Sequence, residues 1–280
     1  MYKDLDFSNK DIDSSFEVIS ISDVTSMLCE PFDAEGVSQN LVEKHYNDEK
    51  SDYYHMSQQE ILDMWSEKGA SSLHYGRLLD DYIGFNLLNE DKNKLEIWKL
   101  DNNYDYDERL KGICESFDNM YAQMMQSGDV KFVAREQTVY YKVPGINCYI
   151  KGRFDALFYN TRLNKYIIDD WKSSGTVDKK PNRYTKKMYG PMYQYPALNW
   201  FTYTIQTHFY KKALLENKYL PEGTTPDDVV TLIVQLPGAM LENGQNFEIH
   251  REAFMYNSEL LDKIFVFAYR KRQLTGNIHQ

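Results

Sequence analysis

The spacing of apolar positions changes once along the chain, close to residue 129. Before that point apolar residues recur every three or four positions, which is the spacing of one face of an α-helix. The helical stretches are residues 20–29, a stretch that begins with the capping-box pattern Ser57–Glu60, residues 71–88 and residues 107–127. Residues 1–20 are polar and are expected to be loosely held, and residues 30–50 to form a polar connection.

After residue 129 the pattern becomes that of β-strands. Residues 130–143, 150–159 and 165–171 are rich in β-branched and aromatic residues, with a Pro144–Gly145 turn and a polar turn at 160–164 between them. A long helix is expected over 188–215, although Pro191 and Pro196 limit where its regular part begins. Strands at 229–236 and 247–251 and a helix at 258–273 complete the chain. The pattern predicts an α/β fold, a mixed β-sheet flanked by helices, with an N-terminal helical lobe (1–128) packed on a core (129–280).

The hairpin at 150–174 contains the most informative group of charges. If its turn is centred between Arg162 and Leu163, Asp155 lies directly opposite Asp170, with Cβ atoms about 5 Å apart. Lys172 projects from the same face as Asp170, whereas Asp169 faces the other way. Two facing carboxylates repel unless a cation lies between them, so the group suits a divalent metal and an activated water. The alternative is a charged hairpin with a surface ion pair, which the apolar run before Asp170 disfavours.

Composition sets limits on the class of protein. A chain of 280 residues can form one large domain, and its three distant cysteines give neither a disulfide framework nor a zinc-binding spacing. No apolar run of transmembrane length and no signal-peptide pattern occurs, which predicts a soluble, cytoplasmic protein that binds no membrane. The net charge of −10 argues against a general positive field for nucleic acid. Residues 172–187 nevertheless contain six basic residues against one acidic residue.

At these residues the sequence resembles a known family. Gly152-Arg-Phe-Asp155 followed by Asp170-Trp-Lys172 is similar to the GxxD…(D/E)xK signature of the PD-(D/E)XK nuclease superfamily, nearest to its RecB-like and phage exonuclease branch. The resemblance implies a restriction-endonuclease-like sheet and Mg²⁺- or Mn²⁺-dependent hydrolysis of DNA. It also implies that Asp155, Asp170 and the main-chain carbonyl of Trp171 bind the metal, and that Lys172 orients the attacking water.

Other residues match the family less closely. Glu136 could be an upstream metal ligand, or it could form a surface pair with Arg135. Gln194 resembles the glutamine of the QxxxY motif on the downstream helix, although Leu198 stands where the tyrosine is expected. Asp80 occupies the histidine position of a GTxxH motif, and His74 precedes its glycine. Each of these two is either a metal ligand or a solvated helix residue.

The basic segment after the hairpin is the expected nucleic-acid contact, because cations bind phosphates and tyrosine rings stack on unpaired bases. A solubilising loop is the alternative. The candidate contacts are Lys179, Lys180, Arg183, Tyr184, Lys186, Lys187 and Tyr195.

Together these features predict a metal-dependent DNA nuclease, favouring an exonuclease of phage or bacterial recombination, repair or replication, with replication or recombination proteins as possible partners. The alternatives are an RNA-directed or endonucleolytic relative and an inactive nuclease-like module that binds DNA or protein. No cysteine follows Cys148, so the four-cysteine iron–sulfur cluster of some relatives is not expected. The chain also lacks the GxxxxGK[ST] pattern of an ATP-driven motor.

Overall fold

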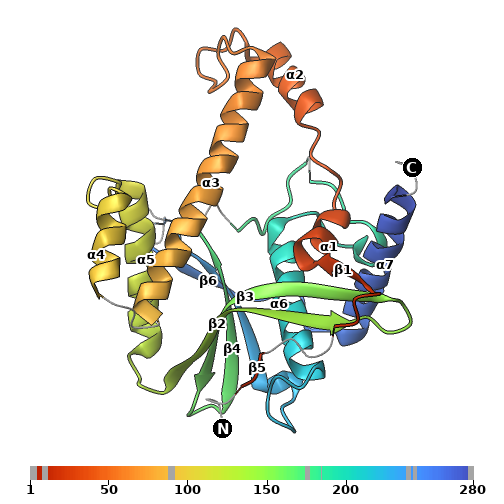
Figure 1. Cartoon of the computed structure of the whole chain (residues 1–280). Helices are drawn as coiled ribbons and strands as arrows, with labels where there is room; N and C mark the ends of the chain where they lie inside the picture. Colours follow the sequence, from red (N-terminus) through yellow and green to blue (C-terminus); the bar gives the residue numbers. More distant parts are fainter. Residues whose placement is uncertain are drawn as a thin grey trace. The chain divides into compact units, whose positions relative to one another are not determined.

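The computed structural model describes residues 5–7, 12–87, 92–173, 177–183, 185–237, 241 and 245–276 (Figure 1). The chain divides into two compact units, a helical unit of residues 31–114 and a sheet unit of residues 1–30 and 115–280.

The helical unit contains α2 (Ala34–His45), α3 (Gln58–Leu87), α4 (Lys92–Asp101) and the first turns of α5 (Glu108–Met125). The predicted capping box is confirmed: the Ser57 N–H donates to Glu60 Oε2 at 2.7 Å, and the Glu60 N–H donates to Ser57 Oγ at 3.3 Å. The two helices predicted beyond it form one 30-residue helix that continues through Gly69, because a helix interior tolerates a glycine at a cost of about 1 kcal/mol relative to alanine. The polar connection predicted at 30–50 was wrong in part, since it contains α2.

The sheet unit is built on a six-stranded mixed sheet, which confirms the predicted fold class. Its strands are β1 (Glu17–Ser20), β2 (Val130–Lys142), β3 (Cys148–Asn160), β4 (Lys165–Lys172), β5 (Val229–Gln235) and β6 (Glu248–His250). The order is β1-β3-β4-β5-β6, with β2 also paired to β3. The pairs β1/β3 and β4/β5 are parallel and the others antiparallel. The loose N-terminal stretch was wrong at its end, because Glu17–Ser20 pairs with β3 and buries Ile19 completely.

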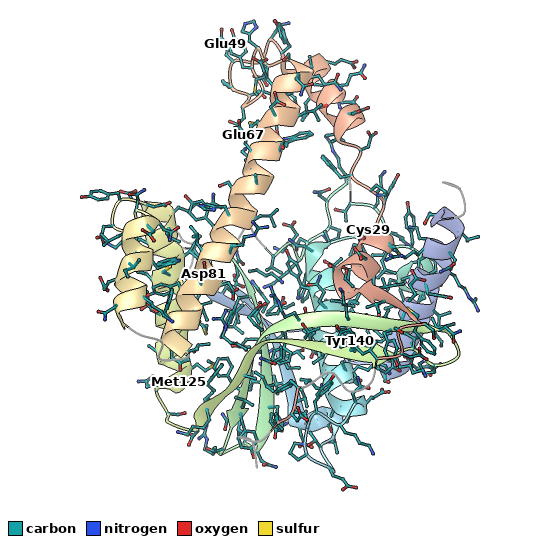
Figure 2. All side chains as sticks on the ribbon, in the orientation of Figure 1. Cys29, Glu49, Glu67, Asp81, Met125 and Tyr140 are labelled. Atoms are coloured by element: carbon teal, nitrogen blue, oxygen red, sulfur yellow. The ribbon has the colours of Figure 1, made fainter. Side chains whose placement is uncertain are left out.

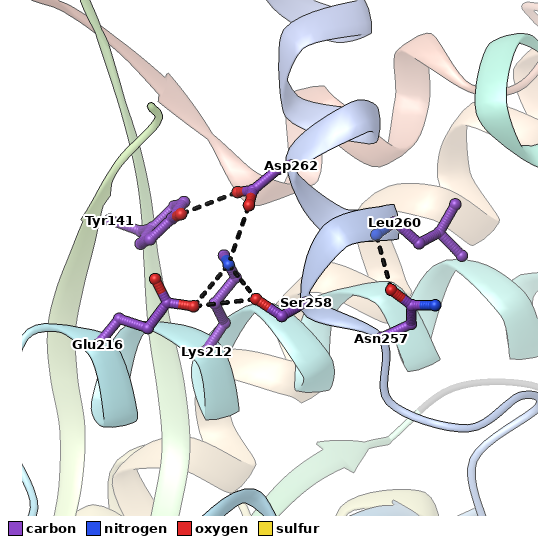
Figure 3. A network of polar contacts seen from close by, with 7 residues as sticks. All are labelled: Tyr141, Lys212, Glu216, Asn257, Ser258, Leu260 and Asp262. Carbon is purple, nitrogen blue, oxygen red and sulfur yellow. Dashed lines mark hydrogen bonds and ion pairs between the residues drawn. The ribbon is translucent and has the colours of Figure 1, made fainter. Parts of the chain in front are cut away.

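Helices lie on both faces of the sheet within this unit. On one face, α6 (Asn199–Glu216) contacts β2, β3, β4 and β5 and packs with α1 (Ile21–Met27) and α7 (Ser258–Gly276). A buried lysine joins α6 to α7: Lys212 Nζ lies 2.6 Å from Glu216, 2.5 Å from Ser258 and 3.3 Å from Asp262 (Figure 3). On the other face, the Phe117 ring of α5 packs edge-on against Trp171, with centroids 5.4 Å apart.

The long helix predicted over 188–215 is shorter than expected. Residues 187–198 form a 3₁₀ turn, η1 (Gly190–Met192), and an isolated bridge between Lys187 and Pro196, and α6 begins at Asn199. Gly190 has a φ of +58°, and a proline in a helix interior removes a hydrogen bond. These residues therefore delay the helix until after Pro196.

The long strands β2 and β3 bend together near their middle (Figure 1). Glu136 stands there with a φ of +52°, which non-glycine residues rarely adopt. Arg135 pairs with Ala156 and Gln137 pairs with Phe154, so Glu136 lies opposite Asp155. The bend therefore coincides with the acidic centre of the predicted site.

Candidate active site

The structure confirms the register predicted for the hairpin. β3 and β4 pair from Asn160↔Lys165 to Ala156↔Asp169 without a shift. Continued by one residue, this register places Asp155 opposite Asp170. Glu136 of β2 lies opposite Asp155 of β3 on its other side. The three neighbouring strands β2, β3 and β4 therefore each contribute one carboxylate, from Glu136, Asp155 and Asp170.

Asp155, Asp170 and Lys172 converge at the end of β4. Lys172 Nζ lies 2.6 Å from Asp170 Oδ2, and the Trp171 main-chain N–H donates to Asp155 Oδ2 at 2.5 Å. The side chain of Asp170 is only 3% exposed, whereas that of Lys172 is 20% exposed. The carboxylate is therefore held inside and the amine lies nearer to solvent.

Trp171 contributes to the site through its main chain. Its ring packs on Phe117 on the opposite face of the sheet. In a strand, the N–H and C=O of one residue point to the same side. The Trp171 carbonyl is therefore directed to the side of β4 on which its N–H meets Asp155.

Burial and neighbouring charges set the electrostatics of the site. Burial, and then the neighbouring Asp170, raise the pKa of Asp155, although Lys172 and the Trp171 N–H oppose this. Burial disfavours the charged form of Lys172, but Asp170 and Asp155 outweigh it and raise the Lys172 pKa. The lysine is thus held as an ammonium beside two carboxyl groups, of which that of Asp170 is almost fully buried.

Glu136 adds to the negative charge but is already engaged. Its Oε2 lies 2.6 Å from Arg153 Nε, and its charge helps to raise the pKa of Asp155. Within the described residues, no group of three Asp, Glu, His or Cys side chains is arranged to hold a metal ion. As a metal ligand, Glu136 would have to leave Arg153, so that role stays a prediction.

Helix α6 supplies residues that the sequence analysis missed. A Cβ at Gly152 would lie 2.6 Å from Phe209 and 2.8 Å from Tyr210, so the glycine lets α6 approach β3 closely. Burial raises the pKa of Tyr210 well above its ordinary range, and Asp170, Asp155 and Glu136 add to the effect. Lys172 Nζ lies 4.6 Å from the centre of the Tyr203 ring. The site therefore faces α6.

Gln206 lies on the same side of α6, since it is three residues from Tyr203 and four from Tyr210. Gln206 and Tyr210 have the QxxxY spacing that was sought at Gln194, and this spacing was the signal that could have identified them. Gln194 lies in an exposed turn before α6, so its assignment to the helix was wrong.

The basic segment is anchored in part by ion pairs. Lys179 Nζ lies 3.1 Å from Glu248, and Lys186 Nζ lies 2.5 Å from Glu30. Tyr195 packs against Phe201 and Phe254, with ring centroids 5.2 and 5.5 Å away, so its ring packs on the hydrophobic core. Three further basic candidates are exposed, Lys180, Arg183 and Lys187. Tyr184 lies outside the described residues.

His74 and Asp80 lie on α3 in the helical unit, the first exposed and the second half-buried. Six residues along a helix turn the side chain by about 120°, so the two face different directions. Their roles as metal ligands stay predictions.

The donor set fits a hard divalent cation. Asp155, Asp170 and the Trp171 carbonyl offer oxygen atoms, which Mg²⁺ and Mn²⁺ prefer, and Lys172 is the cation next to the two acids. Mg²⁺ commonly binds through one or two carboxylates and keeps several waters, so Asp155 and Asp170 can suffice while Glu136 stays paired with Arg153.

The fold can be compared with that of a solved structure. No family model and no curated protein matches the chain. A crystal structure of a "Putative exonuclease" from Eubacterium rectale aligns with 93% of this chain and 83% of its own, with a TM-score of 0.44 and 14% identity. No helix in the described part of the chain has the length and apolarity needed to cross a membrane.

Proposed function

We propose that this protein is a Mg²⁺- or Mn²⁺-dependent deoxyribonuclease that hydrolyses phosphodiester bonds, acting from DNA ends. The observation that carries the proposal is the convergence of Asp155 and Asp170 beside Lys172, where burial and then the charge of Asp170 raise the pKa of Asp155. Action at ends follows from the sequence resemblance to the phage exonuclease branch.

Each residue of the group has a distinct task. Asp155, Asp170 and the Trp171 carbonyl would hold the metal, which supplies an activated water and stabilises charge on the phosphoryl oxygens. The Trp171 N–H fixes the orientation of the Asp155 carboxylate. Lys172 stays charged through its contact with Asp170, and it orients the attacking water and stabilises the charge that develops at phosphorus.

Helix α6 would position the substrate. Tyr203 and Tyr210 lie close enough to the acids and to Lys172 to interact with them electrostatically. Gln206, between them on the same side of the helix, is placed to hydrogen-bond the scissile nucleotide. Gly152 permits this approach because it has no Cβ to push α6 away.

The proposal is tested with purified protein, Mg²⁺ or Mn²⁺, and end-labelled linear DNA beside circular DNA. We expect metal-dependent release of nucleotides from linear DNA and no cleavage of the circle. Cleavage of circular DNA would indicate an endonuclease, and no hydrolysis of either substrate would contradict the proposal.

The neighbouring acids on β4 provide a matched pair of variants. Asp170→Asn removes a ligand from the site and should abolish cleavage. Asp169→Asn removes the same charge on the opposite face, where burial raises the Asp169 pKa to about 7, and should leave cleavage near wild type. Equal loss of activity in both variants would show a general effect on the fold instead of a site at Asp170.

A further inference from the structure

The outer half of the β2–β3 hairpin presents a surface that the proposed active site does not use. This β2–β3 ribbon comprises residues 137–154, where the two strands pair with each other beyond the bend. Its inner side chains are buried, among them Val139, Tyr141 and Ile150. Its outer face carries the alternate residues Thr138, Tyr140, Lys142, Tyr149, Lys151 and Arg153.

The charge of the ribbon differs from that of the whole chain. Residues 137–154 contain Lys142, Lys151 and Arg153 and no acidic residue, in a protein of net charge −10. All three basic residues are exposed. Asp13 interacts with Lys142 and Glu136 with Arg153, so Lys151 contributes most of the uncompensated positive charge.

Aromatic rings alternate with the basic residues across the two strands. Tyr140 pairs with Lys151 and Lys142 pairs with Tyr149, so each of the two lysines stands beside a tyrosine at about 5 Å between Cβ atoms. Figure 2 labels Tyr140 on this ribbon, where its side chain is half-buried. Phe16 packs on Tyr149 at 5.5 Å between centroids, and Lys142 Nζ lies 4.5 Å from the Phe16 ring centre.

The face leads into the active site. Lys151 and Arg153 are two residues apart on β3, or about 6.6 Å, and the next residue on that face is at the bend. Arg153 contacts Glu136, which lies opposite Asp155. A nucleic-acid strand that lay along Tyr140, Lys151 and Arg153 would therefore reach the acidic side chains of Glu136 and Asp155.

We propose that the outer face of the β2–β3 ribbon binds single-stranded DNA, with Lys151 and Arg153 on its phosphates and Tyr140 stacked on a base. Alternating cations and aromatic rings are the combination that binds unpaired nucleotides without regard to sequence. A duplex, with its bases already stacked, leaves the tyrosine without a partner. Binding of single-stranded DNA by the ribbon does not depend on the proposed nuclease activity. Its role in guiding DNA to Asp155 and Asp170 rests on the proposed function.

Binding is measured by fluorescence anisotropy of a labelled oligothymidylate with the full chain in chelator, so that cleavage does not occur. Lys151→Ala should weaken binding about threefold to tenfold and reduce the magnitude of the salt slope by about 0.7, the value for one phosphate contact on a single strand. Tyr140→Leu, which keeps an apolar side chain, should weaken it at least about fivefold.

Lys131→Ala is the matched control, since Lys131 is an exposed lysine of β2 on the other side of the bend. It should change the affinity less than about twofold. Equal weakening by Lys131→Ala and Lys151→Ala would overturn the inference, as would a duplex that binds as tightly as the single strand and is insensitive to Tyr140→Leu.

The outcomes for binding and hydrolysis are separable. A protein that cleaves DNA, and whose Lys151→Ala and Tyr140→Leu variants bind single strands as the wild type does, contradicts the ribbon alone. A protein that binds through the ribbon but hydrolyses nothing with Mg²⁺ or Mn²⁺ contradicts the nuclease proposal alone.

Discussion

Two groups in the sheet unit have the same composition, one lysine with two carboxylates, yet opposite arrangements. In the α6–α7 group, Lys212 is 1% exposed, and its partners Glu216 and Asp262 are 42% and 31% exposed (Figure 3). In the candidate active site, Asp170 is 3% exposed and Lys172 is 20% exposed. One group buries its cation and leaves its acids near water, and the other buries one acid, Asp170, more deeply than its lysine.

The difference indicates what each group can do. Water screens the two acids around Lys212, and Ser258 provides a further hydrogen-bond partner at 2.5 Å. Asp170 is not screened by water in this way. Burial and then the charge of the neighbouring Asp170 raise the pKa of Asp155. The Lys212 group is therefore satisfied and connects two helices, whereas the Asp155–Asp170 group holds two neighbouring acids beside one lysine, as the proposed metal site requires.

The largest expected effect is on catalysis. Lys172→Met should reduce the rate of DNA cleavage about 10²- to 10⁴-fold, because it removes the charged group beside the attacking water. Lys165→Met, at the other end of β4, should cleave at near the wild-type rate. Rates per folded protein, compared under saturating metal, check this prediction. A Lys172→Met enzyme of full activity would remove Lys172 from the mechanism.

The second effect is on stability and concerns the other lysine. Lys212→Ala should lower the free energy of unfolding by about 2–4 kcal/mol, because it removes the cation shared by Glu216 and Asp262 and leaves a cavity between α6 and α7. Urea denaturation measures it. If Lys212→Ala were as stable as wild type yet inactive, the assignment of the two groups would have to be exchanged.

Gly152→Ala tests how closely α6 must approach the sheet. The added Cβ would lie 2.6–2.9 Å from Phe209, Tyr210 and Ile21. Overpacking of this kind costs about 1–3 kcal/mol and should move Tyr210 away from Asp155. We expect a lower midpoint of thermal unfolding together with reduced cleavage by the protein that remains folded. Unchanged stability and activity would show that the close approach is not required.

The acid pair predicts a particular dependence of stability on pH. Because the folded protein raises the pKa of Asp155 above its ordinary 3.8, it retains a proton that the unfolded chain has released. The stability of the metal-free protein should therefore fall as the pH rises from about 4 towards neutrality. Asp155→Asn should reduce this fall in the free energy of unfolding by about 1 kcal/mol, which corresponds to about 2–4 °C in the midpoint of thermal unfolding. A metal-free protein whose stability rises across this range would contradict a raised Asp155 pKa.

The smallest expected effect is at the QxxxY pair on α6. Gln206→Ala should raise KM with a smaller change in kcat, because the residue is proposed to place the substrate. Gln194→Ala, in the exposed turn, should change neither constant. Steady-state kinetics on linear DNA separate the two, and an effect at Gln194 alone would restore the original assignment.

The parts of the site that are local in sequence could be predicted from it. The register that sets Asp155 against Asp170 follows from turn residues and alternating apolar positions within a short hairpin. The contacts of Glu136 could not be predicted, because they depend on a bend in β2 and on a positive φ. Similarly, the pairing of Glu17–Ser20 with β3 joins segments far apart in the chain and leaves no local pattern.

The helices show the same limit. The capping box of Ser57 and Glu60 was readable because both partners lie within one turn. Helix α2 was missed because Ser38 is its one fully buried residue, so it has almost no apolar stripe. Gln206 was missed because the start of α6 was placed eleven residues too early, which drew attention to Gln194.

The most direct test of the central claim is the structure of crystals soaked with Mn²⁺, whose anomalous scattering locates the ion. The account predicts Mn²⁺ with carboxylate oxygens of Asp155 and Asp170 at about 2.0–2.4 Å, the Trp171 carbonyl among its neighbours and Lys172 turned toward a bound water. Mn²⁺ absent from this position at saturating concentration, with Lys172 still paired to Asp170, would contradict it.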